Sequence, residues 1–136
     1  MHIEEVRAYC LKKKGKVTEG TPFGEGVLVF KVHGKMFLLA MLDGHPVSVN
    51  LKCDPELAVE YRERYEGVTP GYHMNKKFWN TVRLDGSIPR SELCRMIDHS
   101  YEMVVRGLGK TLSAKILGDP VTGGGKKTKP PRKAGA

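Results

Sequence analysis

The residues best suited to contact a ligand are concentrated between positions 71 and 80. This segment combines basic, amide and aromatic side chains: Tyr72, His73, Asn75, Lys76, Lys77, Trp79 and Asn80. Ammonium groups can contact phosphates, while amides and aromatic rings can hydrogen-bond with bases or stack on them. In the alternative, structural interpretation, Trp79 anchors a strand in the core, and His73 and Asn75 satisfy backbone groups of a loop. Both interpretations stay open for the two lysines, whereas the structural one is preferred for Trp79.

Further basic residues join this candidate set from other parts of the chain. Lys31 and Lys35 flank a turn at His33-Gly34, and Lys52 and Arg83 point to the polar sides of their expected strands. Isolated lysines on solvated strand faces usually only increase solubility, so their clustering in space would decide the matter. The C-terminal candidates are Lys126, Lys127, Lys129, Arg132 and Lys133.

The formal net charge of +8 is distributed unevenly along the 136 residues. Residues 109–136 contain seven basic residues and one acidic residue, a charge of 7 − 1 = +6, and residues 1–108 keep 16 − 14 = +2. Glycine, proline and lysine dominate the C-terminal segment, which predicts a disordered tail that adds sequence-independent phosphate contacts. The charge of the folded part leaves the domain's own partner open.

No catalytic or metal-binding set is recognisable in the sequence. The five histidines are not spaced like metal ligands, and the three cysteines form no C-x-x-C pair. Cys94, Asp98 and His99 share a predicted helix, but the adjacent Asp98 and His99 point apart, which disfavours a catalytic pair. Gly109-Lys110-Thr111 lacks the glycine spacing of a phosphate loop. We therefore expect no enzyme activity, no metal and no cofactor.

The elements that must position the candidate residues follow from periodicity and capping signals. Helices are expected from Ile3 to Lys14, after the Asp54-Pro55-Glu56 start signal, and from Pro89 to Leu108. Strands are expected on both sides of His33-Gly34 within residues 27–42, at residues 47–52 and at residues 78–84, the last with a shorter partner before it. The sequence thus predicts one α+β domain over residues 1–108, with an antiparallel sheet of about five strands in the order α-β-β-β-α-β-β-α. Leu112, Ile116 and Leu117 could extend the last helix, and disorder is expected from Gly118 onward.

Five sequence motifs together carry a family resemblance. They are Pro22-Phe23-Gly24-Glu25 leading into Phe30-Lys31-Val32, Gly34-Lys35-Met36-Phe37, Asn50-Leu51-Lys52-Cys53-Asp54-Pro55, the segment from Gly71 to Asn80, and Asp98-His99-Ser100-Tyr101. In these motifs and their order, residues 1–108 resemble the MmcQ/YjbR family of small bacterial proteins. The resemblance implies a fold similar to that of type III secretion chaperones, and DNA binding through a "double wing" of hairpins. Fold alone does not determine activity.

The leading hypothesis is a non-enzymatic nucleic-acid-binding protein that uses a winged antiparallel sheet and a basic tail. The alternative is a protein-binding or small-ligand-binding module with a chaperone-like fold, which a large exposed apolar patch would favour. The acidic N-terminus lacks the pattern of a secretory signal, and no apolar run approaches the length that spans a bilayer. Together with the unpaired cysteines, this predicts a cytoplasmic protein with no membrane partner.

Overall fold

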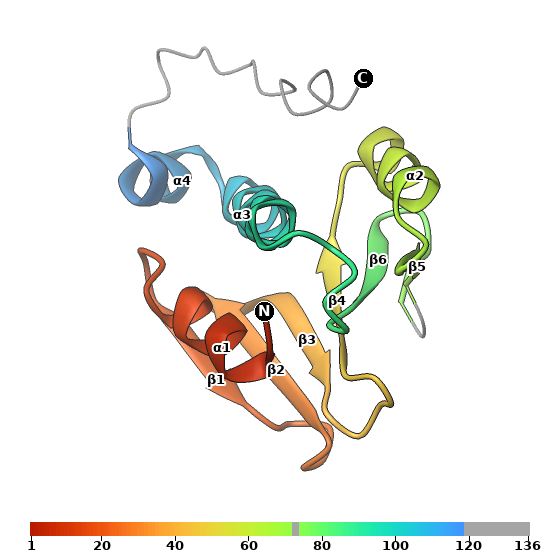
Figure 1. Cartoon of the computed structure of the whole chain (residues 1–136). Helices are drawn as coiled ribbons and strands as arrows, with labels where there is room; N and C mark the ends of the chain where they lie inside the picture. Colours follow the sequence, from red (N-terminus) through yellow and green to blue (C-terminus); the bar gives the residue numbers. More distant parts are fainter. Residues whose placement is uncertain (72–73, 119–136) are drawn as a thin grey trace.

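A six-stranded antiparallel sheet organises the fold. The computed structural model describes residues 1–71 and 74–118. The strands lie in the order β1-β2-β3-β4-β6-β5, so β1 and β5 form the two edges (Figure 1). The elements are α1 (Ile3–Leu11), β1 (Val17–Gly20), β2 (Val27–Val32), β3 (Lys35–Met41), β4 (Ser48–Lys52), α2 (Pro55–Arg64), β5 (Val68–Pro70), β6 (Trp79–Arg83), α3 (Arg90–Arg106) and α4 (Lys110–Leu117).

The predicted class, an α+β domain with an antiparallel sheet, is confirmed, and two elements add to the expected order. Strand β1 makes the sheet six-stranded instead of about five-stranded. It has no detectable sequence signal. Of its four residues only Val17 is half-buried and the others are exposed, so the strand shows no alternation of apolar and polar residues. Helix α4 lies in the segment assigned to the tail. Its Ile116 is buried in the common core, so the folded part extends to Leu117.

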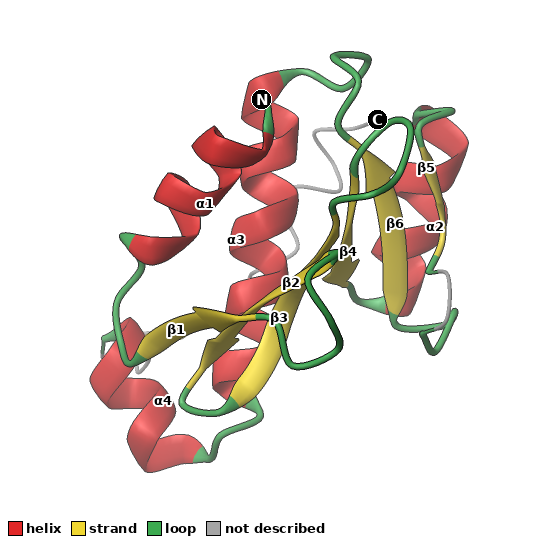
Figure 2. Cartoon of the chain, turned by 90° about the horizontal axis from the view of Figure 1, so that it is seen from below, coloured by secondary structure: helices red, strands yellow, loops and turns green. Residues whose placement is uncertain are grey.

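The core lies between the sheet and its helices. Helix α3 packs across β2, β3 and β4, α1 lies against β1, and α2 covers β5 and β6 (Figures 1 and 2). The predicted apolar stripe of α3 is buried: Leu93, Ile97, Tyr101, Val104 and Val105. Because these residues recur at helical spacing, a single helix face supplies a large part of the core.

The helix-start signal of α2 and the turn signal between β2 and β3 form the structures that the sequence predicts. The Asp54 carboxylate accepts hydrogen bonds from the N–H groups of Glu56 (3.1 Å) and Leu57 (3.2 Å), and Pro55 is the first residue of α2. At the β2–β3 turn, His33 and Gly34 both have positive φ, 49° and 83°. Such a pair matches the twist of a tight two-residue hairpin. The α2 start follows directly after β4, which carries Lys52, and the turn joins β2 and β3, which carry Lys31 and Lys35.

Within residues 1–71 and 74–118, no helix is both long enough and apolar enough to cross a lipid bilayer.

Candidate nucleic-acid interface

The antiparallel strand order sorts the connections of the fold into two groups. Residues 12–16, 33–34 and 71–78 connect elements at one end of the sheet, where β4 also ends. Figure 2 shows the β2–β3 hairpin and the α1–β1 connection beside α4 at this end. We call it the lysine end, defined by Lys12, Lys13, Lys14, Lys16, Lys31, Lys35, Lys52, Lys76 and Lys77.

The connections at the opposite end of the sheet are acidic. Each of its four connections contains one acidic residue and no lysine or arginine; the acidic residues are Glu25, Asp43, Glu66 and Asp85. At the lysine end, residues 12–16, 33–34 and 71–78 contain no acidic residue. Asp54 lies there too, but its carboxylate is engaged by the N–H groups of α2. The connections at the two ends of the sheet therefore differ in the sign of their charge.

Five predicted site lysines belong to the lysine end. Lys35, Lys76 and Lys77 are exposed, while Lys31 and Lys52 are half-buried on their strands. Strands β2 and β4 are two strand spacings apart, about 10 Å, and β6 follows directly after β4. The fold thus brings together lysines that are up to 46 positions apart (77 − 31) in the chain.

The turn that presents Lys76 and Lys77 is held by amide and guanidinium groups. Asn75 Oδ1 accepts a hydrogen bond from the Lys77 N–H (2.9 Å), as the structural interpretation of Asn75 expects. The Arg62 guanidinium donates to the backbone oxygen of Lys76 and to Asn80 Oδ1, the latter at 2.7 Å. Arg62 is not identifiable from the sequence, because its partners lie 14 and 18 positions away and no local pattern links them.

Trp79 does not anchor the core as expected. It is half-buried, it lies outside the core cluster of the described residues, and it stands opposite Lys52 at the start of β6. The Gly71 N–H donates to the Trp79 carbonyl (2.8 Å), and a Cβ at Gly71 would lie 2.8 Å from Trp79 Cβ. Glycine at this position therefore permits the close backbone approach between residue 71 and Trp79, the residue that lies opposite Lys52.

Arg83 is separated from the other candidates. It lies at the far end of β6, opposite Ser48, and its Nε is 3.4 Å from Asp85 Oδ2. Hydrogen bonds from Ser87 lower the pKa of the Asp85 carboxyl, and Arg83 adds to that effect. Arg83 thus belongs to the acidic end. The other predicted contacts, His73, Lys126, Lys127, Lys129, Arg132 and Lys133, lie outside the described residues.

The α1–β1 connection adds lysines that are absent from the predicted set. His33 joins this connection to the β2–β3 turn: its Nε2 accepts from the Lys16 N–H (3.1 Å), and its N–H donates to the Lys16 carbonyl (2.9 Å). The run Lys12-Lys13-Lys14-Gly15-Lys16 is visible in the sequence, but by itself it indicates only the end of a helix. Its place beside the hairpin depends on the β1 pairing, which the sequence does not reveal.

The Asp98-His99-Ser100-Tyr101 motif is structural. Asp98 Oδ1 accepts from Tyr9 Oη (2.7 Å) and Lys13 Nζ (2.5 Å), and His99 Nε2 accepts from the Asp54 N–H (3.1 Å). Ser100 and Tyr101 bind backbone groups of other elements. Each of the four residues therefore connects α3 to another part of the chain.

Within the described residues, nucleophiles and metal ligands do not converge on a site either. Burial raises the pKa of both the Cys10 and the Cys53 thiols to about 12, which disfavours the reactive thiolate. No group of three or more His, Cys, Asp or Glu side chains within residues 1–71 and 74–118 could hold a metal ion.

Fold and site together define a small α+β domain whose antiparallel sheet is backed by helices and has one basic end. Solved structures share this architecture. A Deinococcus radiodurans protein is 34% identical, with a TM-score of 0.78 over 88% of this chain and 89% of that chain. A Pseudomonas syringae protein is 27% identical, with a TM-score of 0.65 over 76% of this chain and 98% of that chain.

Sequence comparison identifies the family. The YjbR family model matches residues 11–103. YbdF of Escherichia coli O157:H7 is 42% identical over 90 residues, 65% of this chain and 73% of YbdF. YjbR of Escherichia coli K12 is 34% identical over 105 residues, 77% of this chain and 88% of YjbR. The chain belongs to the YjbR family, which confirms the resemblance. Both relatives are described as uncharacterized, so membership by itself assigns no activity.

Proposed function

We propose that this protein binds nucleic acid through the lysine end of its sheet, without catalysing a reaction. The observation that carries the proposal is the separation of charge between the two ends. Lysines from four separate parts of the chain meet at one end, and each connection at the other end carries an acid. Such a surface attracts and orients a polyanion in a way that scattered lysines do not.

The arrangement supports contacts with the phosphate backbone more than with base edges. The exposed cationic groups at the lysine end are ammonium groups, which neutralise phosphates without reading sequence. The two hairpins, β2–β3 and β5–β6, lie on either side of β4 and present Lys35, Lys76 and Lys77. Trp79, half-buried beside Lys52, supplies a ring on which an unpaired base can stack. We therefore propose binding with little sequence preference.

The proposal is tested by comparing two variants of the full chain that have equal net charge. Lys76→Gln with Lys77→Gln removes two charges from the lysine end. The matched control, Arg83→Gln with Arg95→Gln, removes two charges from exposed positions, one of which is at the acidic end. Binding to a labelled DNA duplex is measured by fluorescence anisotropy at several salt concentrations. The slope of log affinity against log salt should fall by about 1.8 in the first variant, since each phosphate that is no longer neutralised accounts for about 0.9, and should stay near the wild-type value in the control.

Two outcomes would contradict the proposal. Equal reductions of the slope in both variants would mean that net charge alone attracts DNA. A second comparison uses a chain that ends at Gly118, which keeps α4 and removes the basic segment after it. If that chain shows no binding to DNA or RNA at low salt, the lysine end is only a solvated surface, and the protein- or ligand-binding alternative becomes the better hypothesis.

A further inference from the structure

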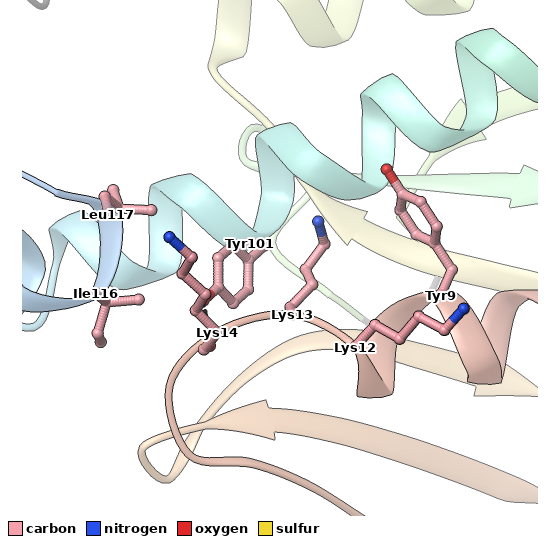
Figure 3. Close-up of a pocket in the computed structure, with 7 residues that line it drawn as sticks. All are labelled: Tyr9, Lys12, Lys13, Lys14, Tyr101, Ile116 and Leu117. Carbon is pink, nitrogen blue, oxygen red and sulfur yellow. Dashed lines mark hydrogen bonds between the residues drawn. The ribbon is translucent and has the colours of Figure 1, made fainter.

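A cavity of about 390 Å³ lies where the C-terminal end of α1 meets α3 and α4. Figure 3 shows its walls: Ile116 and Leu117 of α4 on one side, the Tyr101 ring of α3 behind, and Tyr9 of α1 at the far end. Three consecutive lysines, Lys12 to Lys14, form its rim. This volume falls within the range of small-molecule sites, about 300–1,000 Å³. The residues that form it give it apolar walls and a cationic edge.

The three rim lysines are not equivalent. Lys13 Nζ lies 2.5 Å from Asp98 Oδ1 and about 5 Å from the Tyr9 and Tyr101 ring centroids (4.8 and 5.1 Å), so its charge is already engaged. In Figure 3 the Lys12 ammonium extends past Tyr9, away from α4, while the Lys14 side chain reaches toward Leu117. Lys14 has no ion-pair partner among residues 1–71 and 74–118.

The position of Lys14 is fixed by its backbone. Its carbonyl accepts a hydrogen bond from the Tyr101 hydroxyl, which holds the α1–β1 connection against α3. Burial raises the pKa of the Tyr101 hydroxyl, so the group stays neutral at physiological pH and adds no negative charge to the cavity. The Lys14 ammonium, which is not in an ion pair within the described residues, therefore lies beside two aliphatic side chains and an aromatic ring (Figure 3).

We propose that this cavity binds a small amphipathic anion, with its carboxylate, phosphate or sulfate head on Lys14 and its apolar body against Tyr101, Ile116 and Leu117. The apolar walls exclude a strongly polar body, because sugar hydroxyls placed there would lose hydrogen bonds to water without replacement. The ammonium gives a preference for an anionic head. Lys14 is one of the lysines that define the lysine end, so this site adjoins the proposed nucleic-acid surface, but its occupant is chemically different from a nucleic acid.

The test is a titration of the full chain with decanoate, decanol and acetate, followed by methyl NMR of Ile116 and Leu117. Decanoate should produce saturable shifts at both methyl sets. Decanol, which lacks the charge, and acetate, which lacks the apolar body, should bind more weakly. Lys14→Gln should weaken decanoate binding by about threefold, the size expected for one partly exposed charge contact, and bring it close to that of decanol. Leu117→Ser should weaken decanoate and decanol alike.

The matched control is Lys115→Gln, which removes the same charge from an exposed position on α4 that does not line the cavity. It should leave decanoate binding unchanged. The proposal is overturned if decanoate does not saturate below about 10 mM, weaker than any useful small-molecule affinity. It is equally overturned if decanol matches decanoate in the wild-type chain, or if Lys115→Gln and Lys14→Gln act alike. Each of these results would leave the nucleic-acid proposal intact, because the test of that proposal uses Lys76 and Lys77.

A free anion and an anionic lipid present the same chemistry, so a further arm repeats the NMR measurement with phosphatidylglycerol vesicles. Shifts at Leu117 with decanoate and not with vesicles assign the site to a free anion. Shifts with vesicles that Lys14→Gln reduces and Lys115→Gln does not reduce assign it to a lipid headgroup.

Discussion

The Ser100 hydroxyl of α3 binds backbone groups of β3 and β4 at the point where these two strands stop pairing with each other. The β3–β4 pairing ends at Leu38 with Leu51, and the next pair in that register would be Phe37 with Lys52. Instead, the fully buried Ser100 Oγ accepts from the Lys52 N–H (2.8 Å) and donates to the Phe37 carbonyl (2.6 Å). The register of β3 against β2 shifts at the same place. A single hydroxyl thus satisfies two backbone groups where β3 departs from regular pairing.

Replacing Ser100 by alanine should therefore destabilise the fold. Ser100→Ala leaves a backbone donor and a backbone acceptor without their partner in a buried place, which costs about 1–3 kcal/mol of unfolding free energy. Ser91→Ala is the control, because Ser91 is an exposed position of the same helix, and its effect should stay within about 0.5 kcal/mol. Urea unfolding measures both. Equal stability of the two variants would show that Lys52 and Phe37 find other partners.

The buried thiols give the fold a dependence on alkaline pH. An ordinary thiol has a pKa of 9.0, and burial raises that of Cys10 to about 12. Above pH 9 the unfolded chain loses this proton while the folded chain keeps it, so stability decreases as pH rises from 9 toward 12. At pH 10.5 this group alone accounts for about 2 kcal/mol.

Cys10→Ala isolates that contribution. The variant is less stable at neutral pH because its core is less well packed, but its further decrease in unfolding free energy between pH 7.5 and 10.5 should be about 2 kcal/mol smaller than in the wild-type chain. Denaturant unfolding at the two pH values gives the comparison. Parallel pH profiles for the two chains would mean that the Cys10 thiol ionises without unfolding.

At the scale of elements, α4 determines where the domain ends. The sequence pattern predicts that end at Leu108, whereas Ile116 is 5% exposed and packs into the core. A chain that ends at Leu108 uncovers the core surface under α4, which should lower its thermal midpoint by several degrees relative to the full chain. A chain that ends at Gly118 keeps the helix and should retain the full-length midpoint. Calorimetry of the three chains checks this, and equal midpoints for all three would show that α4 is dispensable.

The elements that can be predicted from the sequence are those with strong local signals. Helix α3 carries a long apolar stripe, α2 has its Asp54-Pro55 start, and β2 and β3 enclose a His33-Gly34 turn. Strand β1 lacks such a signal, because an exposed edge strand has no buried alternation. Helix α4 has only a weak one, Leu112, Ile116 and Leu117, because it is short and flanked by glycines. The place of each in the domain depends on its tertiary partners.

The candidate site is predictable to a similar degree. The lysines of the β5–β6 turn and the β2–β3 hairpin are identifiable by type, and their convergence follows from a strand order that the sequence does not specify. Arg83 is a candidate in the sequence because it follows closely after Trp79. Strand β6, however, runs for five residues from Trp79 to Arg83, so Arg83 lies at the opposite end of the sheet. The roles of Arg62 and Lys14 depend on contacts between distant segments, which periodicity cannot reveal.

At the scale of the whole molecule, the charge of the connections changes from acidic at one end of the strands to basic at the other. Helix α1 continues this pattern, since it has Glu4 and Glu5 in its first turn and leads into Lys12 to Lys14. The Glu5 carboxylate is paired with Arg90, near the start of α3. The charges of the described residues therefore favour one orientation of an approaching polyanion, and the two proposed sites lie toward that same end.

The two edge strands of the sheet, β1 and β5, limit the addition of further strands from other chains. β1 has four residues, and β5 has three and ends at Pro70, which has no N–H to donate. A further strand from another chain would find few free backbone groups on either edge, and such short edges are one way in which proteins avoid aggregation. The chain can thus present a largely exposed basic surface at high concentration without offering its sheet as a template for fibre formation.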